Sequence, residues 1–351
     1  MAEDVNTIEP ASNRFGSARR KAVSVSQERL VNKSFLPAHE GFPLVVQPEV
    51  ENLNLAVWAA NNRQLIEQEL LTSGAILFRG FKVETVEKFE DVARAVSPQL
   101  LDYRERSSPR TEVGKGIYTS TDYPADQPIH FHNEQSYTKS WPMKLWFYCL
   151  KAAEQRGATP IADGRKVLSL IDPEIRERFL RRKVMYVRNY GGGMGLSWQT
   201  AFQTDKPSEL EDYCRRSAID FEWMGDNRLR TRQIFDTIVT HPKTNEAVWF
   251  EHAAFFHVSA IEPAMREALL AEYKEEDLPS NTYYGDNAPI EDSVLEQIRA
   301  AYKQAAVSFT WQEGDLLLID NMLTSHGRES FVGQRKIVVA MAELWPTRDK
   351  Q

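Results

Sequence analysis

Residues 314–321 read Gly-Asp-Leu-Leu-Leu-Ile-Asp-Asn, and this stretch decides the fold class. Four consecutive aliphatic residues between two aspartates predict a short strand that is buried on both faces, inside a sheet. A polar segment with His326 and Gly327-Arg328 follows, and residues 335–344 then predict another buried strand. The C-terminal part of the chain is therefore expected to run from strand through a polar loop to strand, with a histidine in the loop.

The rest of the chain mixes helical and strand patterns. Apolar residues at helical spacing predict one helix over 55–71, capped by Asn52 or Asn54 and stopped by Gly74. Further helices are expected at 86–96, 172–180, 208–214, 263–275 and 290–304. Further strands are expected at 75–79, 143–150, 183–190, 237–240, 247–250 and 306–311. Strands far apart in sequence with helices between them favour an α+β protein with a β-sandwich or jelly-roll core and helical insertions.

Composition limits the class of protein. The 351 residues are 42% hydrophobic, which suffices for a sizeable core. Residues 1–30 are polar and aperiodic, so we expect a flexible N-terminal arm, followed by a single domain over 31–351. The net charge of −7 argues against nucleic-acid or anionic-membrane partners, and no apolar run is long enough for a membrane helix. With no signal-peptide pattern and two distant cysteines, we expect a cytoplasmic protein.

Three residues form a candidate metal site. His132-Asn133-Glu134 has the spacing His-x-acid, which on a strand places an imidazole and a carboxylate on one face. With His326 they make two histidines and one carboxylate, a set that leaves positions open on non-haem iron(II). His130 shares the expected face of His132, and we expect it to pack rather than to bind metal. His39 and His241 are expected in solvent-exposed loops, whereas His252 and His257, in an aromatic-rich stretch, are expected to pack near the pocket.

The segments around this site contain a candidate carboxylate anchor. A basic residue on the strand after His326 could hold a carboxylate with two hydrogen bonds. Arg335 and Lys336 both qualify, because a one-residue shift in register exchanges their facing. Thr159, in the segment Gly-Ala-Thr-Pro, could add a hydroxyl hydrogen bond to the same carboxylate.

These motifs resemble the taurine dioxygenase (TauD/TfdA-like) superfamily, on its clavaminate-synthase-like side, and above all the aspartyl hydroxylases of syringomycin-type pathways. The resemblance rests on His132-Asn133-Glu134, on Gly-Ala-Thr-Pro at 157–160 and on Asn-Met-Leu-Thr-Ser-His-Gly-Arg at 321–328, and it spans about residues 70–345. It implies a double-stranded β-helix core with iron(II) bound by His132, Glu134 and His326. It also implies that Thr159 and Arg335 hold 2-oxoglutarate, which is consumed together with O₂.

The resemblance further implies that an amino acid is hydroxylated, free or tethered to a peptidyl carrier protein, in natural-product biosynthesis. Candidate substrate-binding residues lie beside the motifs: Arg104, Arg110, Asn133, Gln135, Tyr137 and Arg328. Residues 103–127 have the composition of a long loop, which we expect to act as a lid, although a solvated charged loop is equally consistent with its arginines.

Several alternatives stay open at this stage. Desaturation and cyclisation begin with the same hydrogen abstraction as hydroxylation. Halogenation is disfavoured because related halogenases carry a small residue where this chain has Glu134. A zinc-dependent hydrolase could use the same three ligands, and a non-catalytic binding module would need none of them. The substrate and the oligomeric state are left open.

Overall fold

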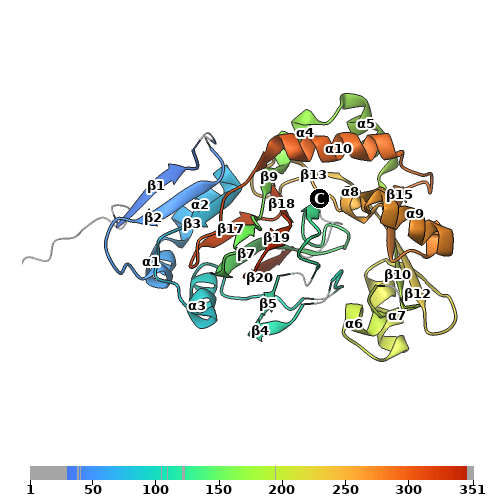
Figure 1. The fold of residues 1–351 in the computed structure, drawn as a ribbon, viewed down its shortest axis with the longest axis horizontal. Helices are drawn as coiled ribbons and strands as arrows, with labels where there is room; N and C mark the ends of the chain where they lie inside the picture. Colours follow the sequence, from blue (N-terminus) through green and yellow to red (C-terminus); the bar gives the residue numbers. More distant parts are fainter. Residues whose placement is uncertain are drawn as a thin grey trace, which may run out of the picture.

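A computed structural model describes residues 30–345 except 38, 40, 104, 109, 121, 122 and 194. Nearly all of the predicted N-terminal arm, and Arg104, therefore lie outside the described residues. The core consists of two sheets (Figure 1). The large sheet has eight strands in the order β1 (Val31–Phe35), β2 (Leu44–Pro48), β3 (Ala75–Phe78), β17 (Leu316–Asp320), β7 (Trp141–Lys151), β20 (Lys336–Trp345), β5 (Ile117–Thr119) and β4 (Glu112–Gly114). The small sheet has four, in the order β16 (Ala306–Val307), β9 (Ile161–Asp163), β18 (Thr324–Arg328) and β6 (Ile129–His132).

Strand β17 lies inside the large sheet, between β3 and β7, with antiparallel pairing on both sides. Its four aliphatic side chains are fully buried and alternate between two apolar clusters. Leu317 and Ile319 face a cluster that also contains Ile161 of the small sheet, so this cluster fills the space between the sheets. The predicted strand is confirmed, and the α+β jelly-roll with helical insertions is confirmed with it.

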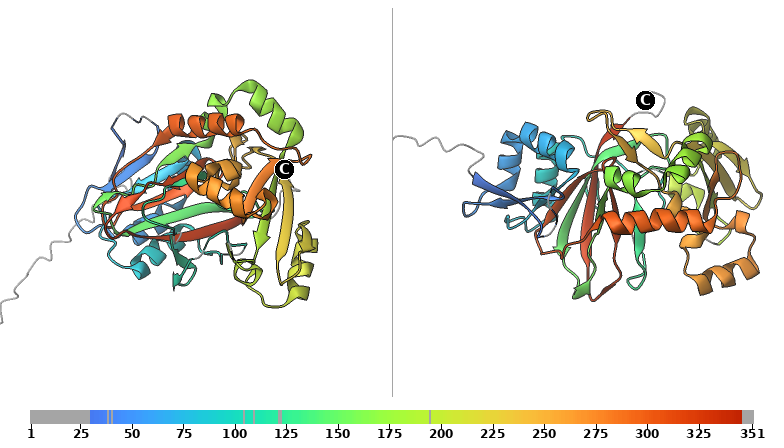
Figure 2. Two further views of the ribbon diagram at one scale, coloured as in Figure 1. Left: turned by 45° about the vertical axis from the view of Figure 1, so that its right-hand side comes forward. Right: turned by 90° about the horizontal axis from the view of Figure 1, so that it is seen from above.

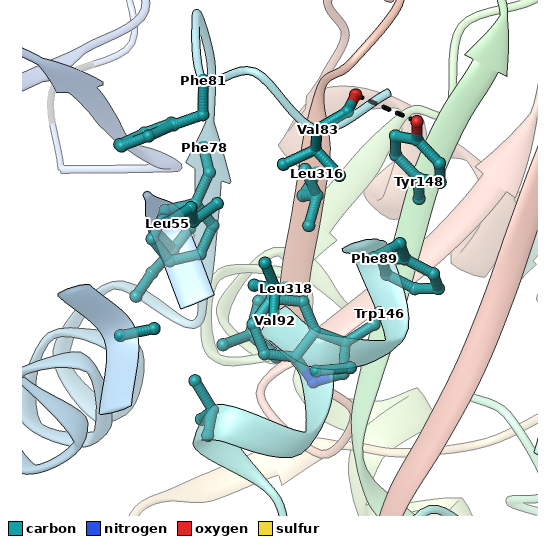
Figure 3. Close-up of a cluster of buried hydrophobic side chains, with 14 of the residues drawn as sticks. Leu55, Phe78, Phe81, Val83, Phe89, Val92, Trp146, Tyr148, Leu316 and Leu318 are labelled. Atoms are coloured by element: carbon teal, nitrogen blue, oxygen red, sulfur yellow. Dashed lines mark hydrogen bonds between the residues drawn. The ribbon is translucent and has the colours of Figure 1, made fainter. Parts of the chain in front are cut away.

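The opposite face of the large sheet is covered by the N-terminal helices. Leu316 and Leu318 pack there against helix α3 (Val86–Val96), as Figure 3 shows. Two aromatic pairs complete the contact. Phe89 stacks on Tyr148 at 5.2 Å between ring centroids, and Phe78 on Trp146 at 6.1 Å. The Tyr148 hydroxyl donates to the carbonyl of Val83 at 3.0 Å, so its one polar atom is satisfied.

The helix predicted over 55–71 is in fact two helices, α1 (Leu55–Asn61) and α2 (Arg63–Ser73). Asn54 caps the first and Gly74, with φ 76°, ends the second, as expected. The break falls at Asn62, whose side-chain amide donates to the carbonyl of Trp58 at 2.8 Å. An asparagine that bonds to its own helix backbone competes with the regular helical pattern, which the apolar spacing does not reveal.

Two other predictions need correction. The segment 103–127 is not all loop, because β4 and β5 form a hairpin within it, and β5 adds to the large sheet beside β20. The strand expected over 306–311 is only Ala306–Val307. The pairing of β16 with β9 ends where Val307 lies opposite Ile161. Pro160, which precedes Ile161 and would be the next partner, has no amide hydrogen to donate.

A long insertion between β9 and β16 covers the small sheet and the far end of the molecule. Figures 1 and 2 show it, coloured green to orange, at the opposite end from the blue N-terminal helices. It contains a second four-stranded sheet of β11 (Asp220–Trp223), β12 (Leu229–Phe235), β10 (Val184–Tyr190) and β15 (Ser280–Tyr284). It also contains a hairpin of β13 (Ile238–Thr240) and β14 (Ala247–Trp249).

The helices of the insertion are α4 (Gly164–Leu170), α5 (Pro173–Arg182), α6 (Trp198–Phe202), α7 (Pro207–Arg216), α8 (Ala253–Phe256), α9 (Pro263–Glu272) and α10 (Asp292–Ala305), with 3-10 turns at Val258–Ala260 and Glu275–Asp277. A last short pair joins β8 (Gln155–Arg156) to β19 (Phe331–Val332). Among the helices described, none is long and apolar enough to cross a membrane. The single domain over 31–351 remains a prediction.

The packing of Leu318 in β17 predicts how a substitution there changes the free energy of unfolding. Leu318→Ala should lower the free energy of unfolding by about 2–5 kcal/mol, because it leaves a cavity beneath α3. Leu344→Ala removes the same atoms from a side chain that is 53% exposed, and should change the free energy far less. Urea denaturation of both variants measures the difference, and equal losses would contradict this packing.

Candidate metal centre

The pairing of β6 with β18 brings the two candidate histidine ligands together. His132 lies directly opposite His326 in this antiparallel pair, and their ring centroids are 4.4 Å apart. The Glu134 carboxylate joins them, so that one ligand atom from each of the three residues lies within 4.8 Å of the other two. All three side chains are buried. The structure thus brings the three predicted metal ligands into one cluster.

The imidazoles have the hydrogen bonding that a metal ligand needs. His132 Nδ1 lies 2.8 Å from the carbonyl of His130. A carbonyl only accepts, so Nδ1 carries the hydrogen and Nε2 keeps the lone pair that a metal takes. His326 Nδ1 is buried and has no hydrogen-bond partner among the described residues. Burial lowers the pKa of both imidazoles, and so favours the neutral form that binds metals.

Glu134 reaches the cluster by a different route from the predicted one. His132 is the last residue of β6, and Glu134 lies in the turn that follows rather than on the strand. The alternation of strand side chains therefore does not bring them together. Instead, Gln135 adopts φ 57°, and the turn is held by hydrogen bonds from Asn321 to the main chain of Glu134.

Arg110 pairs with the carboxylate of Glu134. Its Nη2 lies 2.8 Å from Glu134 Oε2, and the two side chains are 5% and 3% exposed. The guanidinium lies over the ring of Tyr103 at 4.6 Å. Removing one member of such a buried pair leaves the other charge uncompensated, so each partner needs the other.

A pocket extends from the two histidines to Arg335. It is lined by Arg110, Ser120, Ile129, His132, Phe147, Thr159, His326, Gly327, Arg328, Arg335, Ile337 and Val339. Thr159 Oγ1 accepts hydrogen bonds from Trp311 Nε1 at 3.0 Å and from Arg335 Nη2 at 3.1 Å. Both lone pairs of this hydroxyl are then used, which leaves its hydrogen for a ligand in the pocket.

Arg335, and not Lys336, occupies the far end of this pocket. Arg335 Nε donates to the carbonyl of Gly157 at 2.7 Å, whereas Lys336 is exposed and lies opposite Lys151. Burial and the neighbouring charge of Arg328 lower the pKa of Arg335 to about 10. The register of β20 therefore places Arg335 in the pocket and Lys336 in solvent.

Arg328 adds a second cation to the same pocket. It is 6% exposed and donates to the carbonyls of Tyr123, Pro124 and Gln127 at 2.6–3.0 Å. Neither Arg328 nor Arg335 forms a salt bridge with another described residue. One buried and one half-buried cation, neither paired with a carboxylate of a described residue, make the pocket suited to an anion.

Comparison with known proteins identifies the family. The model of the family described as "Taurine catabolism dioxygenase TauD, TfdA family" matches residues 38–341. The dapdiamide synthesis protein DdaC of Enterobacter agglomerans is 42% identical over 286 residues, which cover 81% of this chain and 87% of DdaC. The chain belongs to the TauD/TfdA family. The resemblance seen in the sequence is confirmed, and with it the enzyme class, a 2-oxoglutarate-dependent dioxygenase that uses iron and O₂.

A more distant relative and two solved structures are also similar to this chain. A clavaminate synthase-like protein of Arabidopsis thaliana is 27% identical over 320 residues, covering 86% of this chain and 94% of its own. The solved structure of PvcB from Pseudomonas aeruginosa aligns with a TM-score of 0.54 at 14% identity, over 91% of this chain and 93% of PvcB. AAD-2, solved with Mn(II) and N-oxalylglycine, aligns at 0.52 and 13%, over 89% and 96%. These two structures support the fold alone.

The other predicted substrate-binding residues of this TauD/TfdA enzyme lie outside the lining of the pocket. Asn133 donates through Nδ2 to the carbonyl of Asn321 at 2.7 Å, and Gln135 is buried in the turn after Glu134. The Tyr137 hydroxyl donates to the carbonyl of Glu105 at 3.0 Å. Arg110 and Arg328 are the candidates that line the pocket.

Two further polar residues lie beside the site: His252, which the sequence predicted to pack near the pocket, and Asn321, for which the sequence predicted no role. The ring of His252 lies 4.7 Å from that of His132, and its Nε2 has no partner among the described residues. Asn321 bonds to Glu134 from the turn between β17 and β18. Neither has a local pattern that distinguishes it from an ordinary buried polar residue. His130 bonds to the carbonyl of Ala260 and is not part of the ligand cluster. The exposed position expected for His241 is wrong, because His241 is fully buried and its Nε2 lies 3.1 Å from Asp320 Oδ2.

The pocket generates a prediction about co-substrate affinity. Arg335→Ala should weaken 2-oxoglutarate binding to the Mn(II)-loaded protein by about 10-fold to 100-fold, the usual cost of a charged hydrogen bond. Lys336→Ala removes a neighbouring charge that faces solvent and should change the dissociation constant less than about 2-fold. Isothermal titration calorimetry compares them, and a larger effect at Lys336 would contradict the register of β20.

Proposed function

We propose that this chain is an iron(II)- and 2-oxoglutarate-dependent hydroxylase of an amino acid, either free or bound as a thioester to a peptidyl carrier protein. The observation that carries the proposal is one pocket that extends from two of the three candidate metal ligands, His132 and His326, to the arginines Arg328 and Arg335. The first end suits a divalent metal and the second suits a carboxylate. Together the two ends match 2-oxoglutarate, which would bind the metal through its keto-acid end and the arginines through its distal carboxylate.

The donor set fits iron(II). His132 would bind it through Nε2, His326 through one ring nitrogen and Glu134 through one carboxylate oxygen, because Arg110 already pairs with the other. Two histidines and one carboxylate leave the remaining coordination positions open. When bound, the iron supplies the oxidation: O₂ and 2-oxoglutarate are converted to succinate and CO₂, and a substrate C–H bond becomes C–OH.

The chain's own residues bind and orient the co-substrate. Arg335 and Thr159 would hold its distal carboxylate, the guanidinium by charged hydrogen bonds and the hydroxyl by its remaining hydrogen. Arg328 lies in the same lining and adds positive charge without a competing carboxylate. Fixing one end of a flexible dicarboxylate in this way directs its keto-acid end toward the ligand cluster.

Aromatic rings enclose the ligands and limit the access of water. Phe255 stacks on His132 at 5.3 Å, and Phe147 packs edge-on against His326 at 5.0 Å. His252 packs against the other side of this group, between Tyr137 and Phe256. Such a shell fixes the orientation of the imidazoles and protects a reactive oxidant from side reactions.

The substrate is inferred from the relatives and from Arg110. DdaC, whose name places it in dapdiamide synthesis, is 42% identical to this chain, which supports an amino-acid-derived substrate in natural-product biosynthesis. Arg110 lines the pocket and pairs with the ligand Glu134, and we propose that it also attracts a substrate carboxylate. Glu134 fills the position that a halide would need, so hydroxylation is preferred over halogenation.

Turnover tests this proposal. Protein supplied with iron(II), O₂ and 2-oxoglutarate should form succinate that increases with one member of a panel of free amino acids and carrier-bound aminoacyl thioesters. His132→Ala and His326→Ala should each lower the rate by at least about 100-fold, because a ligand is lost. His39→Ala removes a histidine outside the site and should retain the wild-type rate.

Three outcomes would contradict the proposal. Retention of turnover by either ligand variant would reject the assigned iron site. Zinc-supported hydrolysis without 2-oxoglutarate would favour the zinc hydrolase instead. Absence of both succinate and iron binding would favour a non-catalytic role for this chain.

A further inference from the structure

The turn that contains Glu134 needs support from outside itself. Gln135, the next residue, has φ 57°, in the left-handed region that residues other than glycine rarely adopt. Such a conformation costs about 1–3 kcal/mol and persists only where the surroundings hold it. Glu134 also comes after the end of β6, so no strand ladder fixes its main chain.

One side chain provides that support. The amide of Asn321 accepts the N–H of Glu134 at 2.8 Å and donates to the carbonyl of Glu134 at 2.9 Å. Both main-chain groups of the carboxylate ligand are therefore bound by a single side chain, much as a neighbouring strand would bind them. The second amide hydrogen goes to the carbonyl of Pro142 at 2.9 Å, at the start of β7.

Asn321 is itself held rigidly. It is fully buried, its N–H donates to the carbonyl of Met143 at 2.8 Å, and its carbonyl accepts from Asn133 Nδ2 at 2.7 Å. The turn that it begins is fixed by Asp320, whose Oδ1 accepts from the N–H groups of Met322 and Leu323 at 2.9 and 3.0 Å. This turn leads directly into β18 and His326.

We propose that Asn321 is a positioning residue that sets the Glu134 carboxylate in place, relative to His326, before the metal binds. This inference rests on the proposed function, because it requires Glu134 to be a metal ligand. Glu134 and His326 are distant in sequence, and both are thereby positioned by the turn that contains Asn321. The site is then formed in the metal-free protein, and the metal does not have to order the Glu134 turn.

The chemistry of the side chain explains why an amide is needed. Only an amide offers both an acceptor for the Glu134 N–H and two donors for the carbonyls of Glu134 and Pro142. A carboxylate of the same shape keeps the acceptor but turns an oxygen toward two carbonyl oxygens. Alanine keeps neither, and leaves three buried main-chain groups without their partner.

Metal affinity with a matched control tests the proposal. Asn321→Ala and Asn321→Asp should each weaken Mn(II) binding by about 10-fold to 100-fold, as expected when a partner of a metal ligand is lost. Thr138→Val is the control, because the single hydroxyl hydrogen of Thr138 is shared between the carbonyls of Gln135 at 2.8 Å and Ser140 at 2.5 Å in the same turn, and these hydrogen bonds do not involve Glu134. It should lower the melting temperature yet leave the Mn(II) dissociation constant within about 3-fold of wild type.

The outcomes separate this inference from the proposed function. Wild-type protein that binds no Mn(II) would reject the metal site and the inference together. Tight binding by wild type, with equal losses in the Asn321 variants and in Thr138→Val, would reject the positioning role alone. So would an Asn321 variant that is destabilised but keeps its Mn(II) affinity.

Hydrogen exchange provides a second test that needs no variant. If Asn321 fixes the turn in advance, the Glu134 amide of the metal-free wild-type protein should exchange slowly, about as slowly as the amides of β18. Addition of Mn(II) should then change its rate less than about 3-fold beyond the change seen for the whole protein. A Glu134 amide that exchanges freely until Mn(II) is added would overturn the proposal.

Discussion

The antiparallel pairing of β6 with β18 is the constraint on which the rest of the site depends. It places His132 opposite His326 through main-chain hydrogen bonds, so the two imidazoles meet without any bond between side chains. On its other edge β18 pairs with β9, whose preceding loop contains Thr159. The large sheet then faces this group with Phe147 and Ile337. A slip of one residue in the pairing would turn His326 away from His132.

The charges of the site follow from this buried position. Three arginines and one glutamate lie in or beside a pocket with largely apolar walls, and the chain compensates each charge differently. Glu134 pairs with Arg110, whereas Arg328 and Arg335 bond mainly to main-chain carbonyls. Carbonyls lower the cost of burying a guanidinium but do not cancel its charge. The remaining positive charge belongs to Arg328 and Arg335, which line the pocket and do not pair with Glu134, and this explains how a dicarboxylate could be bound in one orientation.

The sequence predicted the elements whose signal is local. The four aliphatic residues of β17 indicated a strand buried on both faces, and the three predicted metal ligands do come together. These ligands are distant in sequence but belong to recognisable motifs, whereas distant contacts of residues without a motif could not be predicted in this way. Asn321 and Glu134 are separated by 187 positions, and a buried asparagine has no periodic pattern. The sequence around Arg110 also does not show whether its side chain is solvated or paired with a carboxylate in the interior. The position of Glu134 in a turn was missed because the spacing His-x-Glu fits a strand and a turn equally well.

Binding of 2-oxoglutarate to the iron(II)-loaded protein, followed anaerobically by visible absorption, tests the central claim most directly. A keto acid that chelates iron(II) produces a charge-transfer band, so the band reports the metal and the co-substrate in one site. The expected result is a charge-transfer band that requires both iron(II) and 2-oxoglutarate and that saturates at a single iron per chain. Iron that binds without such a band, or a band that persists when His326 is replaced by alanine, would contradict it.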